Sequence, residues 1–361
     1  MDSRLLATLN AQASGTLDPV LWARAVCRAS SHFARHGMTR EALKSISVVR
    51  AQFGNELHHE VASWLMLAEG VLHFFQLQPR ESYDRIRRGY GLAVALKTDS
   101  ALPSCAAWMA HFEFNECMYD KMVFHLQEAL TLAKADDHQA HARASLVLAD
   151  AFHLAGEYVL ARPWYEKTRQ RAAAEGDEAT LSAMLYNVAA FRAANVRLDD
   201  AFGIEMTKEA HRASMETSSS INYDYAIGTL SLDFLSHMLR GLIFTIDKKY
   251  NEAIEIFKGI DLTKIPKRML GSVHADVAWC SANIGQEAAS CERAKLAADA
   301  LIYITDSDDC AYVNSRIANV AALCNRPEDE SRFRLAANEA LKEHRKFQAD
   351  LLQMLKSIKV E

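Results

Sequence analysis

The chain has 361 residues, half of them hydrophobic, and a formal net charge of −5. This mild charge gives no reason to expect nucleic acid or an anionic membrane as partner, and only 6 Pro and 14 Gly argue against an all-β or low-complexity chain. No run of 18 apolar residues occurs, and residues 1–15 lack the apolar core of a secretory signal. We therefore expect a cytoplasmic protein without a membrane partner.

The first clear helix start is at Asp18, a good N-cap, followed by Pro19, which suits the first helical turn. Residues 1–17 are then either a tail or a short capping helix.

The segment from Leu148 to Tyr165 predicts two closely packed helices. Ala149 and Ala161 are small enough to let the helix axes approach, Phe152 fills the space beside them, and Gly156 ends the first helix.

This pattern recurs along the chain. Aligning the turns on the position held by Ala161 gives successive spacings of 40, 40, 39, 40, 52, 37 and 43 residues. A period near 40 over eight units indicates a repeat array. The sequence Asn-Val-Ala-Ala, which begins at Asn187 and again at Asn319, lies 14 residues before its aligned position both times. The aligned positions are Ala42, Ser82, Met122, Ala161, Ala201, Ala253, Ser290 and Phe333.

With its Gly-Glu-Tyr turn and the following Ala161, the pattern resembles the tetratricopeptide (TPR) repeat, in the longer form found in bacterial regulators of the maltose-regulator and Rap phosphatase families. The resemblance covers residues 18–345. It implies an all-α fold: a right-handed TPR-like α-solenoid of about eight helical hairpins, closed by a long C-terminal helix.

The aligned units divide the chain. Residues 18–213 hold units one to five, and residues 221–326 hold units six and seven and the first helix of unit eight. Between them, the Ser- and Thr-rich residues 214–220 predict an insertion, either a surface loop or a hinge. Residues 327–361 form a long helix that caps the array. The alternative for the stretch beyond residue 345 is that it projects and forms a homodimer.

Motifs of catalysis are missing from the sequence. There is no phosphate loop, no Gly-x-Ser-x-Gly and no His-Glu-x-x-His. The pairs His32/His36 and His138/His141 could each share a helix face, but no further metal ligands accompany them. We expect no catalytic residue, no metal and no cofactor. The Asp-Asp pairs at 136–137, 199–200 and 308–309 lie beside predicted turns and should cap helices.

Seven cysteines without a Cys-x-x-Cys spacing lie mostly in apolar helical patterns, which predicts buried, reduced thiols. A cysteine nucleophile has no local signature here.

One basic segment combines arginine with aromatic residues, a mixture that can hold RNA or single-stranded DNA. Glu81 and Asp84 lie among these residues, so salt bridging on a helix surface explains the mixture better. Nucleic acid is therefore not an expected partner. The segment contains Arg80, Arg85, Arg87, Arg88, Tyr83 and Tyr90.

The TPR resemblance implies that the first helix of each unit lines a concave groove. Asn187 and Asn319 fall where many peptide-binding arrays keep an asparagine, whose amide can both donate to and accept from a peptide backbone. Helix packing is an equally good reason for these asparagines. The further groove candidates are Asp150, His153, Tyr186 and Trp279.

These features favour a non-catalytic scaffold or adaptor that binds a protein or peptide in its groove. The alternative is a bacterial signalling regulator whose array changes curvature on binding a peptide or partner. An all-α enzyme is the third hypothesis, and a deep pocket with converging polar groups and a perturbed acid or base would favour it.

Overall fold

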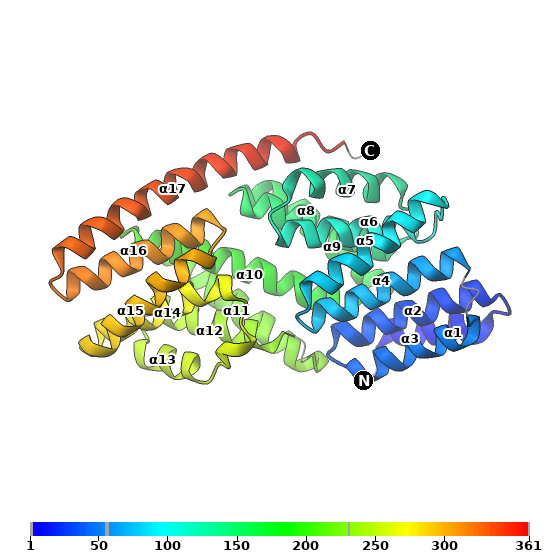
Figure 1. The fold of residues 1–361 in the computed structure, drawn as a ribbon, viewed down its shortest axis with the longest axis horizontal. Helices are drawn as coiled ribbons and strands as arrows, with labels where there is room; N and C mark the ends of the chain where they lie inside the picture. Colours follow the sequence, from blue (N-terminus) through cyan, green and yellow to red (C-terminus); the bar gives the residue numbers. More distant parts are fainter. Residues whose placement is uncertain (1–2, 55–57, 230–231, 360–361) are drawn as a thin grey trace. The chain divides into compact units, whose positions relative to one another are not determined.

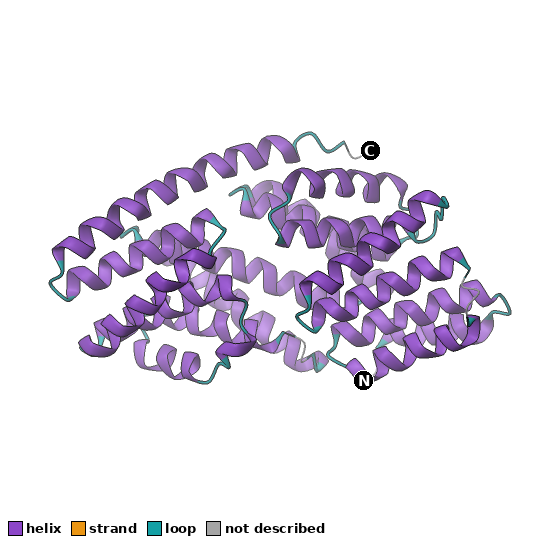
Figure 2. Ribbon diagram, viewed as in Figure 1, coloured by secondary structure: helices purple, strands orange, loops and turns teal. Residues whose placement is uncertain are grey.

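A computed structural model describes residues 3–54, 58–229 and 232–359. All regular secondary structure in these residues is helical (Figure 2). The fold is therefore all-α, as the sequence predicts. An isolated first helix, α1 (Arg4–Gly15), is capped by the Ser3 hydroxyl, which accepts from the backbone N–H of Leu6. Leu5 and Leu9 of α1 pack with Ala29. Of the two alternatives for residues 1–17, the structure matches the capping helix.

After α1 the helices follow one another in pairs (Figure 1). The first four pairs are α2 (Pro19–Arg35) with α3 (Thr39–Phe53), α4 (His59–Phe75) with α5 (Pro79–Ala95), α6 (Leu102–Asn115) with α7 (Tyr119–Leu132), and α8 (His138–Leu154) with α9 (Tyr158–Glu175). The next four are α10 (Glu178–Ala201) with α11 (Thr207–Ile227), α12 (Asp233–Ile246) with α13 (Tyr250–Lys258), α14 (Lys267–Asn283) with α15 (Glu287–Ala300), and α16 (Ser307–Leu323) with α17 (Pro327–Leu355). Two short 3-10 helices, η1 (Leu262–Lys264) and η2 (Leu301–Tyr303), lie between pairs.

All eight pairs turn in the same way. The second residue after each first helix has a positive φ, and the next N–H donates to the carbonyl five residues earlier, as from Glu157 to Phe152 at 2.9 Å. This is the Schellman end of a helix. Spacings of 40, 40, 39, 47, 45, 37 and 40 residues separate the eight turns and confirm the repeat. The turn residues are Gly37, Leu77, Cys117, Gly156, Gly203, Lys248, Gly285 and Asn325.

Two of the eight aligned positions are wrong. Six lie five residues after their turn residue, but Ala201 is the last residue of α10 and Phe333 lies eight residues after Asn325. The aligned position of the fifth unit is wrong because the sequence Asp199-Asp200 is typical of a turn. Carboxylates near a helix C-terminus are unfavourable, but Asp200, one residue before the end of α10, is paired with the buried Arg316, which offsets this effect.

Close packing explains why the repeat is visible in the sequence. Seven residues before each turn residue lies a buried position that is small in every pair except the fifth. At Gly241 an added Cβ would come within 2.7 Å of the Phe257 ring, so the two helices of this pair touch through glycine. The buried positions are Ser30, Gly70, Ala110, Ala149, Val196, Gly241, Ala278 and Ala318.

The chain divides into two compact units, each containing several of the hairpins. The first comprises Met1–Met184, Tyr223–Ser231 and Leu351–Glu361, and the second comprises Leu185–Asn222 and Leu232–Asp350. The first boundary falls inside α10 and not in the region 214–220, where we expected a five-unit part to meet a three-unit part.

Residues 214–220 form the middle of α11, so the predicted insertion loop is wrong. Serine often leaves helices because its hydroxyl competes for backbone groups. Here the hydroxyls of Ser218 and Ser219 instead donate back to the carbonyls of Ser214 and Met215, both at 2.9 Å, within the helix. The extra length of the fifth unit comes from the long helices α10 and α11.

The predicted long C-terminal helix is present as α17, but the expectation that its end projects is wrong. Leu351 and Leu355 are buried in the first unit. Beyond them, Gln127 of the same unit exchanges two hydrogen bonds of 2.6 Å with the backbone of Lys359. A homodimer through this helix remains a prediction.

The prediction that the three Asp-Asp pairs cap helices is only partly confirmed. Asp137 caps α8, since its carboxylate accepts from the N–H of Ala140 at 3.1 Å, but Asp199-Asp200 lies within α10 and Asp308-Asp309 lies in the first turn of α16.

The cysteines are less buried than expected. Cys27, Cys105 and Cys280 are buried, and the remaining four are half-buried: Cys117, Cys291, Cys310 and Cys324.

Candidate functional site

The end of α10 and the loop before α11 carry a pocket of the second unit with a volume of about 560 Å³. Its apolar wall includes Val196, Ile246 and the exposed Ile204 and Met206. The loop exists because Gly203 takes the left-handed conformation that ends α10, and α11 begins only at Thr207.

The charged groups of this pocket are mainly acidic. Asp200, Glu205 and Asp247 line it together with Lys248 and His211. However, Arg316 pairs with Asp200 and Lys249 pairs with Asp247 at 3.7 Å, so neighbouring basic groups largely balance the carboxylates of this first pocket.

A second pocket of about 420 Å³ adjoins the first, because Asp200 and Gly203 line both. Its other polar and aromatic residues include Trp279, Arg316 and Asn319. The two pockets together present apolar, acidic and aromatic groups along one stretch of the second unit.

Arg316 connects the second pocket with the protein interior. Its side chain is only 1% exposed, yet its guanidinium pairs with Asp200, which is 37% exposed. The guanidinium also lies 4.7 Å from the centroid of the Trp279 ring. Burial opposes its positive charge, but Tyr312 and Asp200 outweigh this and raise the pKa of Arg316 above its ordinary value.

A buried charged network continues behind Arg316. The Tyr312 hydroxyl donates to Asp276, and Arg197 pairs with Asp309 at 2.7 Å and lies 4.0 Å from the centroid of the Tyr312 ring. Burial raises the pKa of Asp276, although Arg197 opposes the shift. Burial and the neighbouring Asp276 also raise the pKa of Tyr312. These groups hold Arg316, and through it Asp200, in a fixed position.

Two of the six predicted groove residues, Asn319 and Trp279, meet in the second pocket. Trp279 is half-buried beneath Arg316. The Asn319 amide donates to the carbonyl of Ala201 at 2.9 Å and accepts from Arg334 at 2.8 Å. It therefore joins α10, α16 and α17, which is the helix-packing role that we considered beside peptide binding.

Asp150 and His153 lie inside the hairpin of α8 and α9, with side chains only 2% and 4% exposed. The Tyr165 hydroxyl donates to Asp150 at 2.9 Å and lies 3.2 Å from the Nδ1 atom of His153. These contacts stabilise the hairpin, and in this conformation the two side chains offer almost no surface to a ligand.

Tyr186 and Asn187 are half-buried on α10, and Tyr186 packs in the apolar cluster around Ala189 and Leu239. Asn187 lies 16 residues before its turn residue, whereas Asn319 lies six before its own. The two asparagines are therefore not equivalent in the repeat, and the repeated Asn-Val-Ala-Ala sequence does not support the alignment of the units.

Sequence reasoning missed Asp200, Arg316 and the loop residues Ile204 and Met206. The available signal was Phe202-Gly203 followed by two exposed apolar residues, which marks a helix end and an unburied apolar surface. The serine-rich stretch at 214–220 led us to predict the break between helices there and not at Gly203.

Two other predicted features have structural explanations. Arg87 and Arg88 pair with Asp84 at 3.6 and 2.9 Å, and Arg85 pairs with Glu69 at 3.4 Å, which accords with a salt-bridged helix surface. The rings of His32 and His36 lie with their centroids 4.4 Å apart and are tilted by 47° relative to each other. In the part of the chain that the structure describes, neither histidine belongs to a cluster of three or more metal-ligating groups.

The eight hairpins define an all-helical repeat protein. No protein-family profile matches the chain, and no curated protein matches it. Among solved structures, the apo form of RapI is similar to it, with a TM-score of 0.48 and 10% identity over 91% of this chain and 87% of that one. Over the described residues, no helix is both long and apolar enough to cross a bilayer.

Proposed function

We propose that this protein is a binding module that captures a peptide segment of a partner protein across the two adjoining pockets of the second unit. The observation that carries the proposal is Asp200, which lines both pockets, is accessible to solvent and is held in place by the buried Arg316. A preorganised, accessible carboxylate can accept from a peptide N–H or a basic side chain without an ordering cost.

The pocket walls specify the peptide further. Ile204, Met206 and Ile246 would contact an apolar side chain of the peptide. Trp279 in the second pocket would contact a further apolar or aromatic residue.

The positions of the acids with shifted pKa values favour binding over catalysis. Asp276 and Tyr312, whose pKa values are raised, line neither pocket, nor does Asp308. An enzyme would need a pocket in which polar groups converge on an acid or base with a shifted pKa, and these residues do not form such a pocket. That the array changes curvature on binding remains a prediction, which small-angle scattering with and without a bound peptide would test.

The test is a peptide-display selection against the whole protein, with affinities of the selected peptides measured by fluorescence anisotropy. We expect Met206→Asp to weaken binding by about tenfold, since it removes apolar contact and adds charge. Met206 lies just before α11, where Asp is a good helix cap, so this variant should fold.

Met215→Asp is the matched control. Met215 lies on α11 in the same unit and is 59% exposed, compared with 36% for Met206, but it lines neither pocket. Equal losses in the two variants, or no loss in Met206→Asp, would show that the peptide binds elsewhere. A selection that yields no peptide would contradict the proposed function itself.

A further inference from the structure

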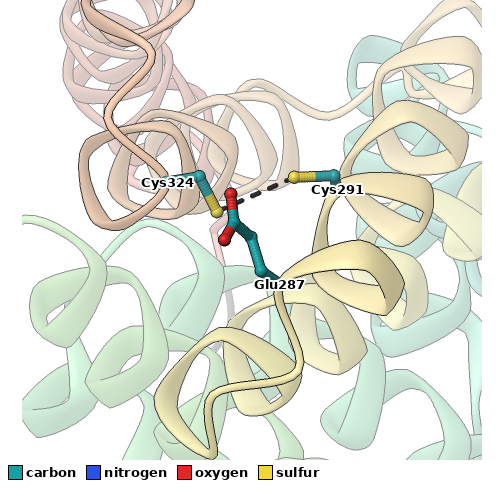
Figure 3. Close-up of side chains that lie close together, drawn as sticks. All are labelled: Glu287, Cys291 and Cys324. Carbon is teal, nitrogen blue, oxygen red and sulfur yellow. Dashed lines mark hydrogen bonds between the residues drawn. The ribbon is translucent and has the colours of Figure 1, made fainter.

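A second site lies on other helices of the second unit, where Glu287, Cys291 and Cys324 converge (Figure 3). One ligand atom from each residue lies within 4.8 Å of the others. Among the described residues, this is the one group of three or more His, Cys, Asp or Glu side chains close enough to share an ion.

The local fold explains the convergence. Glu287 and Cys291 are four residues apart at the start of α15, so they lie on one face of that helix. Cys324 is the residue that ends α16, a helix that packs against α15. In Figure 3 the carboxylate of Glu287 and the two thiols point into the same space.

The distance between the sulfur atoms fits a shared metal ion. Zinc–sulfur bonds are about 2.3 Å long, so two thiolates on a tetrahedral zinc lie about 3.8 Å apart. The Cys291 and Cys324 Sγ atoms are 3.7 Å apart.

The surroundings leave room for an ion. The carbonyls at the C-terminal end of α16 carry partial negative charge next to Cys324. A pocket of about 330 Å³ lined by both cysteines gives an ion access and leaves space for a water ligand. Its other charged lining is mixed, with Asp299 and Asp329 beside Lys295, Arg326 and Arg332, so the three ligand atoms and not the charge of the pocket favour the ion.

We propose that Glu287, Cys291 and Cys324 bind one zinc-like divalent ion, through two thiolates and one carboxylate, with water in the fourth position. Both thiols lose their protons to solvent when the ion binds, so ion uptake acidifies a weakly buffered solution. The site shares no residue with the two peptide pockets and does not depend on the proposed function.

Cobalt is the probe, because thiolate coordination gives Co²⁺ a strong near-ultraviolet charge-transfer band. We expect the reduced full-length protein to bind one equivalent of Co²⁺ with this band and zinc to displace it. Cys291→Ser and Cys324→Ser should each weaken binding by about 100-fold or more, since losing even the hydrogen-bond partner of a ligand costs 10–100-fold. Glu287→Gln should weaken it less.

Cys310→Ser is the matched control, because Cys310 is also half-buried in the second unit but lies outside the cluster. A rise in melting temperature with zinc, present in this control and lost in Cys291→Ser, provides a readout that does not depend on colour. Absence of the thiolate band, or a band that persists in both cysteine variants, would overturn the proposal. So would a pair that only forms a disulfide on addition of peroxide and never binds the ion.

Discussion

Each compact unit buries a cluster of charged and titratable side chains, and the cluster of the second unit ends at an accessible carboxylate that lines two pockets. In the first unit, Arg35 pairs with Asp177 at 2.8 Å, and Thr180 bonds to both. His32 and His36 lie beside them, buried, and the structure shows no hydrogen bond to any of their four ring nitrogens.

In the second unit the network runs from Asp309 through Arg197 and Tyr312 to Arg316, and ends at the accessible Asp200. Buried charge thus serves two purposes in one repeat protein. The first cluster pairs its charged groups internally but leaves the histidine ring nitrogens without hydrogen bonds, whereas the second positions a charged group at a surface. This difference can be tested by stability measurements.

The largest expected effect is that of Asp177→Ala. It leaves the Arg35 guanidinium buried without its carboxylate, so we expect the free energy of unfolding to fall by about 3–5 kcal/mol. Urea unfolding measures this loss. The double variant Arg35→Met with Asp177→Leu should lose less than Asp177→Ala alone, because it removes both charges. A smaller loss in the single variant would mean that water reaches the site.

Per pH unit, a smaller effect should appear on acidification, through the histidine pair. Burial, together with the nearby positive charge of Arg35, lowers the pKa of His32 to about 3 and that of His36 to about 4. The unfolded chain protonates both near pH 6.5, so the stability that neutral histidines provide is complete above pH 6.5 and is lost as the pH falls toward 4. The slope can reach about 1.4 kcal/mol per pH unit for each histidine.

Thermal melts between these pH values, for the wild type and His32→Leu with His36→Leu, would measure the slope. The variant should flatten it. An unchanged slope would assign the acid sensitivity to other groups.

The smallest expected effect has the opposite sign and belongs to the second unit. Burial, together with Asp309 and Asp306, raises the pKa of Asp308 to about 7. Below pH 3.8 its stabilising contribution is complete, and it is lost as the pH rises through about 7. Asp308→Asn should therefore raise the melting temperature at alkaline pH and have little effect in acid. Asp350→Asn, at an exposed position in the same unit, is the control. Equal shifts in the two variants would contradict the assignment.

The sequence predicted the repeat because its evidence is local. The small buried residue seven positions before each turn and the turn itself lie within one hairpin, so Ala149 and Gly156 reveal their roles without coordinates. The alignment of the fifth unit failed at Asp199-Asp200, in the last turn of α10, where Asp200 pairs with Arg316, 116 residues further along the chain. A pattern read within one repeat contains no information about such a partner.

The candidate site was predicted only in part for the same reason. Trp279 and Asn319 were chosen from their places on first helices, and they do meet in one pocket. Asp150 and His153 were chosen by the same rule but are buried by Tyr165. Exposure depends on how neighbouring helices pack, and periodicity alone does not specify it.

The carbonyl of Ala201 has a consequence for synthesis of the chain. It accepts hydrogen bonds from Ser315 and Asn319, which lie 114 and 118 residues later. A ribosome adds about 5–20 residues per second, so the end of α10 waits roughly 6–23 seconds for these partners. During that interval water must satisfy this carbonyl, and the fifth hairpin is complete only once the first helix of the eighth has been made.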